Sequence, residues 1–428
     1  MENINRIVLL IVPEFPPNDS IGGRRWAKFA KYLAKKNVVV KVIAFEPKQR
    51  NGNSNWVADI THPNIEVFYV PSYYPAILQS TSSNFIVRIL KKICSLSIAL
   101  YDGGIIQDKA IFFKKTLLKK AGELIRKYEI QNVICSGPYH RASYFTTLLK
   151  KEYSNLNVII DFRDRWTDGQ VYGIEKVGHS AFLKESALQK YTCEQADVVI
   201  STYAEILKEL KQEYTSLPEN KFIHFPHNFD LDDYPHASTT TISKTQKNRI
   251  KFIYGGTINT AAFNDAFKSF FYALRELKDK EPDTYKLLEI EIYGENYQLN
   301  QLVASLEIGD RVTIYPKTGE VDFYQKVAES DFPMIFLGAQ WKDLMTTKSI
   351  AYLPFRKPIL VFSEAGGVSK MVLDNKLGFH LSPGNCFENL LNLLHNYQLG
   401  KLEFDPHFDF SRYSYEAATD KLIQLLKF

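Results

Sequence analysis

The chain has 428 residues, of which 45% are hydrophobic, 14% aromatic and 24% charged. This composition excludes wholesale disorder, and the length suggests two or three domains that can each bury a core. A net charge of +5 is too small to indicate a dedicated nucleic-acid-binding protein, so no nucleic-acid partner is expected.

The four cysteines form no CxxC pair, which argues against a zinc site or a disulfide scaffold and favours a reducing compartment. The apolar run at 7–12 is too short for a signal peptide. No apolar stretch approaches the length of about 20 residues that a spanning helix needs. We therefore expect a cytoplasmic protein that can lie peripherally at the inner face of the membrane.

The first half of the chain alternates short apolar runs with amphipathic segments. Residues 7–12 are typical of a buried parallel strand, and 24–36 place apolar side chains at helical intervals. Further strands are predicted at 38–45, 65–70, 133–136, 158–162 and 198–201. This alternation predicts a parallel sheet with helices on both faces.

A polar stretch rich in Ser and Thr, 236–248, is the predicted linker. After it, strands are predicted at 251–254, 288–293, 312–315, 333–337 and 358–362, and helices at 262–279, 321–329 and 347–355. We therefore predict an α/β protein with two doubly wound, Rossmann-like domains, 1–235 and 249–410, facing each other across a cleft. Such sheets bind ligands at the carboxyl ends of their strands.

The loop after the first strand ends in Gly22, Gly23, Arg24 and Arg25. Glycines directly before a helix let the backbone approach an anion, and arginines add planar donors. An ordinary strand-to-helix turn with solvated arginines would have the same sequence.

Two further segments follow strands of the first half. In CSGPYHR, His140 lies near a helix start, where it can bind a sugar hydroxyl or phosphate, move a proton, or simply pack. In DFRDRWTD, the charged residues Asp161, Arg163 and Asp164 either pair with one another or face the cleft. A carboxylate in the cleft could orient an acceptor hydroxyl or act as a base.

The second half contains three turns that can bind an anion. The first is YGGT, the second precedes a short helix and offers hydroxyls and an ammonium group, and the third is EAGG. Their candidate donor-binding residues are Gly255, Gly256, Thr257, Thr346, Thr347, Lys348, Gly366 and Gly367. Each turn also fits ordinary turn chemistry, but three at one sheet edge favour a phosphate site.

The basic stretch 88–127 has interleaved apolar residues, which suits either a solvated helix face or an anionic membrane surface. Membrane contact through 86–127 is therefore a hypothesis. Residues 230–233 (DLDD) contain a pair of the type that binds divalent metals, but a surface turn is the expected structure and we predict no metal site.

In chain order, GGRRW, SGPYH, DFRDRW, ADVVIST, FPHNFD, FIYGGT and TTKSIAYLPFRKPILVFSEAGG resemble a bacterial retaining glycosyltransferase of the GT-B fold, in the large family four. The resemblance spans nearly the whole chain and is greatest to members that build cell-surface polysaccharides. It implies that a final helix, 411–428, crosses back to the first domain. It also implies metal-independent transfer, without a cofactor, from a nucleotide-sugar donor to a glycan or lipid-linked glycan acceptor.

The resemblance also implies residue roles, with the acceptor on the first domain and the nucleotide on the second. Gly22 and Gly23 match the loop near the donor diphosphate, His140 matches a histidine near the transferred sugar, and Lys348 falls at the phosphates. The expected catalytic residues are His140, Asp161, Asp164 and Asp343, and the expected acceptor-side residues are Arg163 and Trp166.

Two departures from the family leave other functions open. The family's Glu-x7-Glu pair is replaced by Asp343, which can keep the sugar contact, and Ala351, which cannot bind a ribose. No cation follows the YGGT turn before Lys268, so Lys348, Arg24 or Arg25 would have to offset the diphosphate charge. The alternatives are a degenerate, non-catalytic binding protein and a GT-B-fold sugar-nucleotide 2-epimerase.

Overall fold

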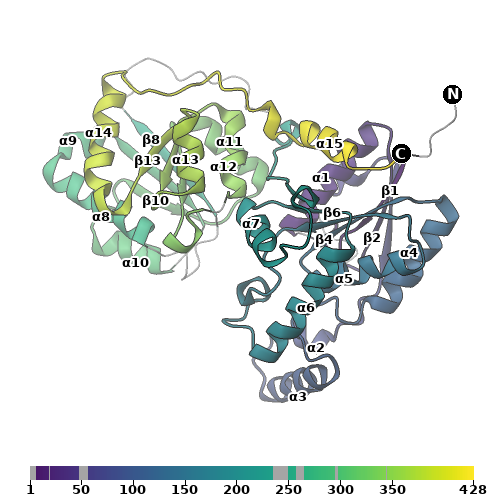
Figure 1. The fold of residues 1–428 in the computed structure, drawn as a ribbon. Helices are drawn as coiled ribbons and strands as arrows, with labels where there is room; N and C mark the ends of the chain where they lie inside the picture. The colour runs from purple at the N-terminus through teal and green to yellow at the C-terminus, as the bar shows by residue number, and fades with distance from the viewer. Residues whose placement is uncertain are drawn as a thin grey trace. The chain divides into compact units, whose positions relative to one another are not determined.

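The computed structural model describes residues 6–18, 20–47, 56–234, 249–256, 265–294, 297–343 and 345–428. The chain divides into two compact units (Figure 1). Unit 1 comprises Met1–Pro226 and Tyr415–Phe428, and unit 2 comprises His227–Ser414. The predicted linker at 236–248 lies outside the described residues.

Unit 1 is built on a seven-stranded parallel sheet in the order β3-β2-β1-β4-β5-β6-β7. The strands are β1 Ile7–Ile11, β2 Val39–Phe45, β3 Ile65–Val70, β4 Asn132–Gly137, β5 Asn157–Phe162, β6 Val198–Ser201 and β7 Phe222–His224. The six predicted strands are confirmed. The short strand β7 was not predicted, because three residues are too few to show a periodic pattern.

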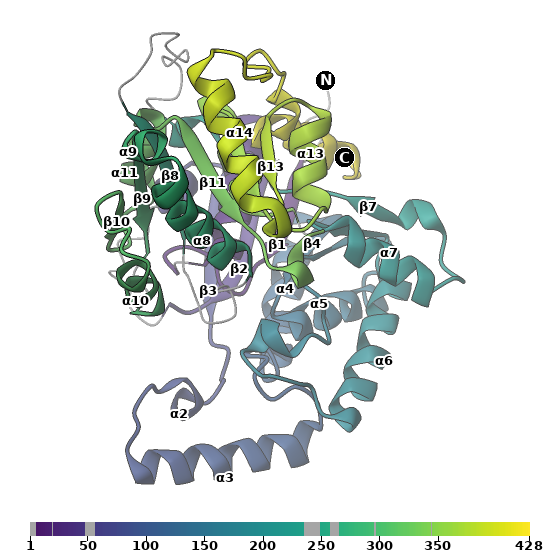
Figure 2. The same ribbon diagram turned by 90° about the vertical axis from the view of Figure 1, so that its left-hand side faces the viewer.

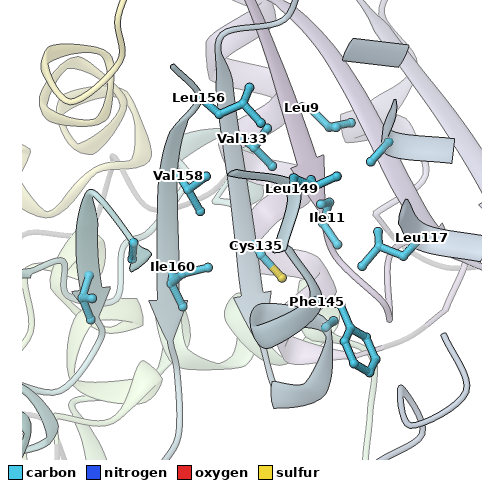
Figure 3. Packing of buried hydrophobic residues seen from close by; sticks show 14 of the residues in the cluster. Leu9, Ile11, Leu117, Val133, Cys135, Phe145, Leu149, Leu156, Val158 and Ile160 are labelled. Atoms are coloured by element: carbon cyan, nitrogen blue, oxygen red, sulfur yellow. The ribbon is translucent and has the colours of Figure 1, made fainter. Parts of the chain in front are cut away.

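The helices of unit 1 are α1 Ile21–Lys35, α2 Ala76–Gln79, α3 Phe85–Asp102, α4 Lys114–Tyr128, α5 His140–Thr147, α6 His179–Gln195, α7 Ala204–Glu213 and α15 Tyr415–Gln424. Side chains alternate between the two faces of the sheet, as the pleat requires. Leu9 and Ile11 join the core under α4 and α5, whereas Val8 and Leu10 join the core under α1 and α15. Figure 3 shows the first of these cores, with Cys135 among its side chains.

The final helix, α15, belongs to unit 1, as the resemblance implied. The Tyr415 ring meets the Phe29 ring of α1 edge-on, with centroids 5.1 Å apart. Beyond the helix, the Asn132 side-chain amide donates to the Lys427 carbonyl oxygen at 2.7 Å, and Asn157 donates to the Leu425 carbonyl oxygen at 2.8 Å. These bonds fix the C-terminal segment at the amino ends of β4 and β5.

Unit 2 contains a six-stranded parallel sheet in the order β10-β9-β8-β11-β12-β13. Its strands are β8 Ile250–Gly255, β9 Leu288–Tyr293, β10 Val312–Tyr315, β11 Phe332–Phe336, β12 Ile359–Phe362 and β13 Gly378–Leu381. Its helices are α8 Asp265–Lys280, α9 Pro282–Lys286, α10 Tyr297–Ser305, α11 Glu320–Glu329, α12 Thr347–Ala351, α13 Gly367–Asp374 and α14 Cys386–Gln398. The predicted helix at 347–355 ends early, because Pro354 lies in a separate 3₁₀ turn, Leu353–Phe355.

Among the described residues, no helix is both long and apolar enough to cross a membrane.

Candidate functional site

In unit 2, the three predicted anion-binding turns follow three adjacent strands. The YGGT turn begins at the end of β8, the loop to α12 follows β11, and the EAGG turn follows β12. Because the strands are parallel neighbours, their carboxyl ends lie at one edge of the sheet. Thr257, predicted as part of this site, lies outside the described residues.

The Lys348 side chain crosses from α12 to the turn after β8. A Cβ added at Gly256 would lie 2.9 Å from both Cε and Nζ of Lys348, so only glycine leaves this space open. The ammonium group also lies over the Tyr254 ring, 5.6 Å from its centroid. Two of the predicted phosphate-binding segments therefore meet through Lys348.

Burial lowers the pKa of Lys348, and desolvation is its cause. Within the described part of the chain, the ammonium has no carboxylate partner within ion-pair distance. A partly desolvated cation beside a glycine favours an incoming anion, because binding compensates for the lost solvation of the charge.

The two threonines before Lys348 have different environments. Thr346 is the N-cap of α12, and its hydroxyl accepts a 3.4 Å hydrogen bond from the Ser349 backbone N–H. The Ser349 hydroxyl donates to the Thr346 carbonyl oxygen at 2.6 Å. Thr347 is exposed at the first helical position. The Thr346 side chain thus holds the local turn, and Thr347 is the more accessible hydroxyl.

The EAGG turn packs directly against the loop that carries Asp343. A Cβ at Gly366 would overlap the Lys342 carbonyl oxygen, and a Cβ at Gly367 would lie 2.6 Å from the Asp343 carbonyl oxygen. Both glycines are therefore needed for close backbone packing. Asp343 itself is exposed at this edge, so its carboxylate can reach a ligand.

An aromatic group that was not predicted covers the same edge. A Cβ at Gly255 would overlap the Phe323 ring of α11. Phe323 meets the Tyr293 ring with centroids 5.7 Å apart, and Tyr293 stacks on Tyr315 at 4.9 Å. Tyr293 and Tyr315 are the last residues of the adjacent strands β9 and β10. Aromatic residues at the ends of two predicted strands could therefore have indicated this group from the sequence.

In unit 1, the structure revises the Gly22–Gly23 prediction. Helix α1 begins at Ile21 with Ser20 as its N-cap, so both glycines lie inside the first turn and not before it. The Gly23 N–H donates to the Ser20 hydroxyl at 2.9 Å. A Cβ at Gly23 would overlap the Glu14 carbonyl oxygen, and a Cβ at Gly22 would overlap the Arg163 guanidinium. In this conformation Gly22 leaves space for the Arg163 side chain, and Gly23 leaves space for the backbone at Glu14.

Arg25, predicted as a donor-binding residue, is held by groups of unit 1 in this structure, and its role at the donor stays a prediction. Its guanidinium is buried and donates to the carbonyl oxygens of Phe225 at 2.8 Å and Pro226 at 2.9 Å. Its Nε lies 3.6 Å from the Asp161 carboxylate. Because these partners already occupy the guanidinium, it has no free edge for a phosphate. Arg24 is half-buried, with its guanidinium over the Trp56 ring.

Asp161 is a fully buried anchor at the end of β5. Its Oδ2 accepts hydrogen bonds from Trp26 Nε1 and from the Ser136 hydroxyl, both at 2.8 Å. Ser136 in turn accepts a 2.9 Å bond from Arg163 Nε, and Arg163 Nη2 donates to the Pro138 carbonyl oxygen at 3.0 Å. Asp161 therefore orients Arg163 through Ser136, a residue that was not predicted although it directly precedes the GPYH segment.

Asp164, unlike Asp161, keeps partial access to solvent. It is half-buried, and burial raises its pKa. The negative charges of Asp161 and Asp168 act in the same direction, while the nearby Arg163 opposes them. A carboxylate with a raised pKa and an accessible oxygen has the properties of a general base.

His140, the first residue of α5, is 0% exposed. It stacks on Trp166 with centroids 5.1 Å apart, and neither ring nitrogen has a hydrogen-bond partner among the described residues. Burial lowers its pKa to about 3, with the Arg163 charge acting in the same direction, so the imidazole is neutral. In this conformation the ring packs in unit 1, and its catalytic role stays a prediction.

Trp166, predicted on the acceptor side, is buried within unit 1 in this structure, and its acceptor-side role stays a prediction. It is 1% exposed, and its indole N–H donates to Glu185 Oε2 at 2.8 Å. Glu185 also accepts from the Arg141 guanidinium through Nη2 at 2.7 Å and Nε at 3.1 Å. The tryptophan of DFRDRW is thus part of a buried network that holds α5 and α6 together.

The DLDD segment is a 3₁₀ turn, Leu231–Asp233, in which Asp230 is buried and accepts a 3.1 Å bond from the Asp232 N–H. Within the described ranges, no group of three or more His, Cys, Asp or Glu residues is arranged to hold a metal ion.

Solved structures share this fold. A glycosyltransferase from Rickettsia africae matches with a TM-score of 0.58 at 16% identity, over 98% of this chain and 93% of that chain. The Anabaena protein HepE in complex with UDP-glucose matches at 0.58 and 12% identity, over 97% and 98%. A UDP-GlcNAc 2-epimerase from Neisseria meningitidis bound to UDP-GlcNAc matches at 0.56 and 12% identity, over 98% and 99%.

No protein-family model and no curated protein sequence matches the chain. At these identities the structural matches establish the fold, and both parallel sheets agree with it. The predicted fold class and the resemblance to GT-B glycosyltransferases are confirmed at that level: the chain has the GT-B fold, with two Rossmann-like units.

Proposed function

We propose that this chain is a glycosyltransferase that moves a sugar from a nucleotide-sugar donor to a glycan or lipid-linked glycan acceptor in surface polysaccharide biosynthesis. The observation that carries the proposal is the close approach of Lys348 to Gly256, which places a partly desolvated cation beside a glycine at the carboxyl edge of the sheet. Structural neighbours bound to UDP-glucose and UDP-GlcNAc support a nucleotide sugar as the ligand.

In this proposal Lys348 offsets the negative charge that develops on the leaving diphosphate. The exposed Asp343 carboxylate accepts hydrogen bonds from hydroxyls of the donor sugar. In unit 1, Asp164 orients the acceptor hydroxyl and accepts its proton. We propose retention of configuration and independence of a metal, with Lys348 in the charge-neutralising role that a divalent ion would otherwise have.

Ligand binding to the native state raises the melting temperature, so a thermal-shift titration tests the donor site directly. We expect UDP to raise the melting temperature of the full chain equally with and without EDTA. A shift that EDTA abolishes would overturn metal independence. Absence of any shift with UDP or other nucleoside diphosphates would favour the non-catalytic binding protein, for which Ala351 is the sequence argument.

A sugar-nucleotide 2-epimerase is the second candidate, because the Neisseria meningitidis 2-epimerase covers the same length of this chain as the glycosyltransferases do. The two activities differ in their need for an acceptor. We expect UDP release from a donor to depend on added acceptor glycan. Inversion at C2 of UDP-GlcNAc without acceptor, followed by NMR, would instead establish the epimerase.

A further inference from the structure

Helix α3 in unit 1 carries an apolar stripe that faces solvent. Phe85, Ile89, Ile93, Leu96 and Leu100 follow one another at intervals of three and four residues, which places them on one face of the helix. Their exposed fractions range from 43% for Ile89 to 81% for Leu100. A helix on a soluble protein normally turns such a face toward the core, and contiguous exposed apolar patches mark interaction sites.

Helix α3 is attached to the rest of unit 1 near its carboxyl end. Ile98 is buried, and the Lys91 ammonium donates to the Ser80 carbonyl oxygen at 2.5 Å. At the end of the helix, the Asp102 carboxylate pairs with Arg141 of α5 at 2.5 Å and with Lys184 of α6 at 3.3 Å. Figures 1 and 2 both show α3 at the periphery of unit 1, beyond the helices that cover the sheet. The carboxyl end of α3 is therefore fixed to unit 1, while the apolar stripe faces solvent.

The charge around the stripe has one sign. Residues 80–101 contain no Asp or Glu, but they contain Arg88, Lys91 and Lys92, and both Arg88 and Lys92 are exposed. An apolar helix face bordered by basic side chains complements a bilayer with anionic headgroups. It does not complement a second copy of itself, because two such faces would bring like charges together.

Helix α4, the other basic segment, has a different environment. Its apolar residues Leu117, Ala121, Leu124 and Ile125 are buried in the core of unit 1. Its lysines therefore occupy the ordinary solvated face of a packed helix. Of the segment 86–127, for which membrane contact was a hypothesis, α3 is therefore the part that we consider further.

We propose that α3 docks unit 1 on the surface of an anionic lipid bilayer, with the helix parallel to the membrane plane. The apolar stripe enters the boundary between headgroups and acyl chains, and Arg88 and Lys92 contact the phosphates of the headgroups. The interaction deepens the proposed function by placing the enzyme where a lipid-linked acceptor is found, but it needs neither donor nor acceptor to form.

Vesicle co-sedimentation of the full chain tests the docking. Wild-type protein should bind vesicles that contain phosphatidylglycerol and should bind pure phosphatidylcholine vesicles much more weakly, with binding that falls as salt is raised. The double variant Ile93→Ser/Leu96→Ser should lose about tenfold or more in vesicle affinity, because two side chains no longer enter the apolar layer. Arg88→Glu/Lys92→Glu should lose as much on anionic vesicles.

The matched control is Lys114→Glu/Lys119→Glu, an equal change of charge on exposed positions of α4. This control should retain at least half of the wild-type vesicle binding. If it lost as much binding as Arg88→Glu/Lys92→Glu, the loss would be explained by net charge alone, and the proposed role of α3 would be overturned. Circular dichroism and the UDP thermal shift verify that each variant is folded, and they report on the donor site separately from the membrane.

Two results would overturn the proposal outright. One is failure of wild-type protein to bind anionic vesicles while it still binds UDP. The other is a change of oligomeric state without vesicle binding: light scattering would show a dimer for the wild type and a monomer for Ile93→Ser/Leu96→Ser, and neither protein would bind vesicles. That result would assign the stripe to a second copy of the chain.

Discussion

The Lys348 ammonium lies against Gly256, in a space that any side chain at position 256 would fill. The two residues are far apart in the sequence, but they follow neighbouring parallel strands, β8 and β11. This contact joins a glycine turn and a cation into one candidate phosphate site, and two predictions follow directly from it.

Replacing Lys348 by Ala should weaken nucleoside diphosphate binding by about tenfold or more, since a hydrogen bond to a charged group is worth roughly 1.5–3 kcal/mol. The control is Lys268→Ala, at an exposed position of α8. Isothermal titration calorimetry with UDP measures both. Equal affinities in the two variants would remove Lys348 from the donor site.

Gly256→Ala should lower UDP affinity by a similar factor while the protein remains folded. The added Cβ would lie 2.9 Å from Lys348 Nζ and 3.0 Å from the Tyr254 hydroxyl, and the flexible lysine can move away more easily than the backbone. Gly256 has a φ of 158°, which also strains the backbone of the alanine variant. Gly400→Ala is the control, because Gly400 also has a positive φ, of 65°, but no atom lies within 4 Å of its added Cβ. If Gly256→Ala bound UDP as tightly as Gly400→Ala, the turn would not be part of the site.

Asp164→Asn should slow sugar transfer by about 100-fold, the usual contribution of a general base, and should leave UDP affinity nearly unchanged. The burial that raises the Asp164 pKa also costs stability. Between the ordinary aspartate pKa and the raised one, the folded chain retains a proton that the unfolded chain has already lost. The free energy of unfolding of the wild type, compared with that of the Asn variant, therefore falls as pH rises through this range. Above the raised pKa it stays at the lower value.

Urea unfolding across this pH range compares the wild type with Asp164→Asn. The variant should be the more stable protein at neutral pH. A variant that is both fully active and no more stable would show that Asp164 is neither the base nor a buried charge.

His140→Phe should keep the protein folded, because the imidazole is neutral, buried and without hydrogen-bond partners among the described residues, and an aromatic ring can replace its stacking on Trp166. We expect transfer to slow at unchanged UDP affinity. Wild-type turnover in this variant would restrict His140 to packing.

Glu185→Gln should destabilise unit 1 by about 1.5–3 kcal/mol, because the buried Arg141 guanidinium would lose one of its two charged partners and keep only Asp102. The Arg165–Glu209 pair offers a control, since both side chains are largely exposed and Glu209→Gln should cost no more than about 1 kcal/mol. Chemical denaturation measures both. Similar losses in the two variants would show that the buried network adds nothing beyond a surface pair.

The strands that are buried on both faces could be predicted from local sequence, because continuous apolar runs such as 7–12 and 158–160 have few other structures open to them. It also located the turns after β8, β11 and β12, since glycines and polar residues at strand ends are local features. The break after Ala351 was missed, although Pro354 was visible in the sequence.

Which polar side chains are available for chemistry depends on the tertiary structure. Arg25 and Trp166 lie in motifs with the residue types of a binding site, yet the fold places their polar atoms on Phe225, Pro226 and Glu185. The physical reason is that a buried donor must find a partner, and strand order decides which groups come within reach. The same applies to α3, whose amphipathic pattern is local but whose apolar face is exposed because none of the described residues of unit 1 covers it.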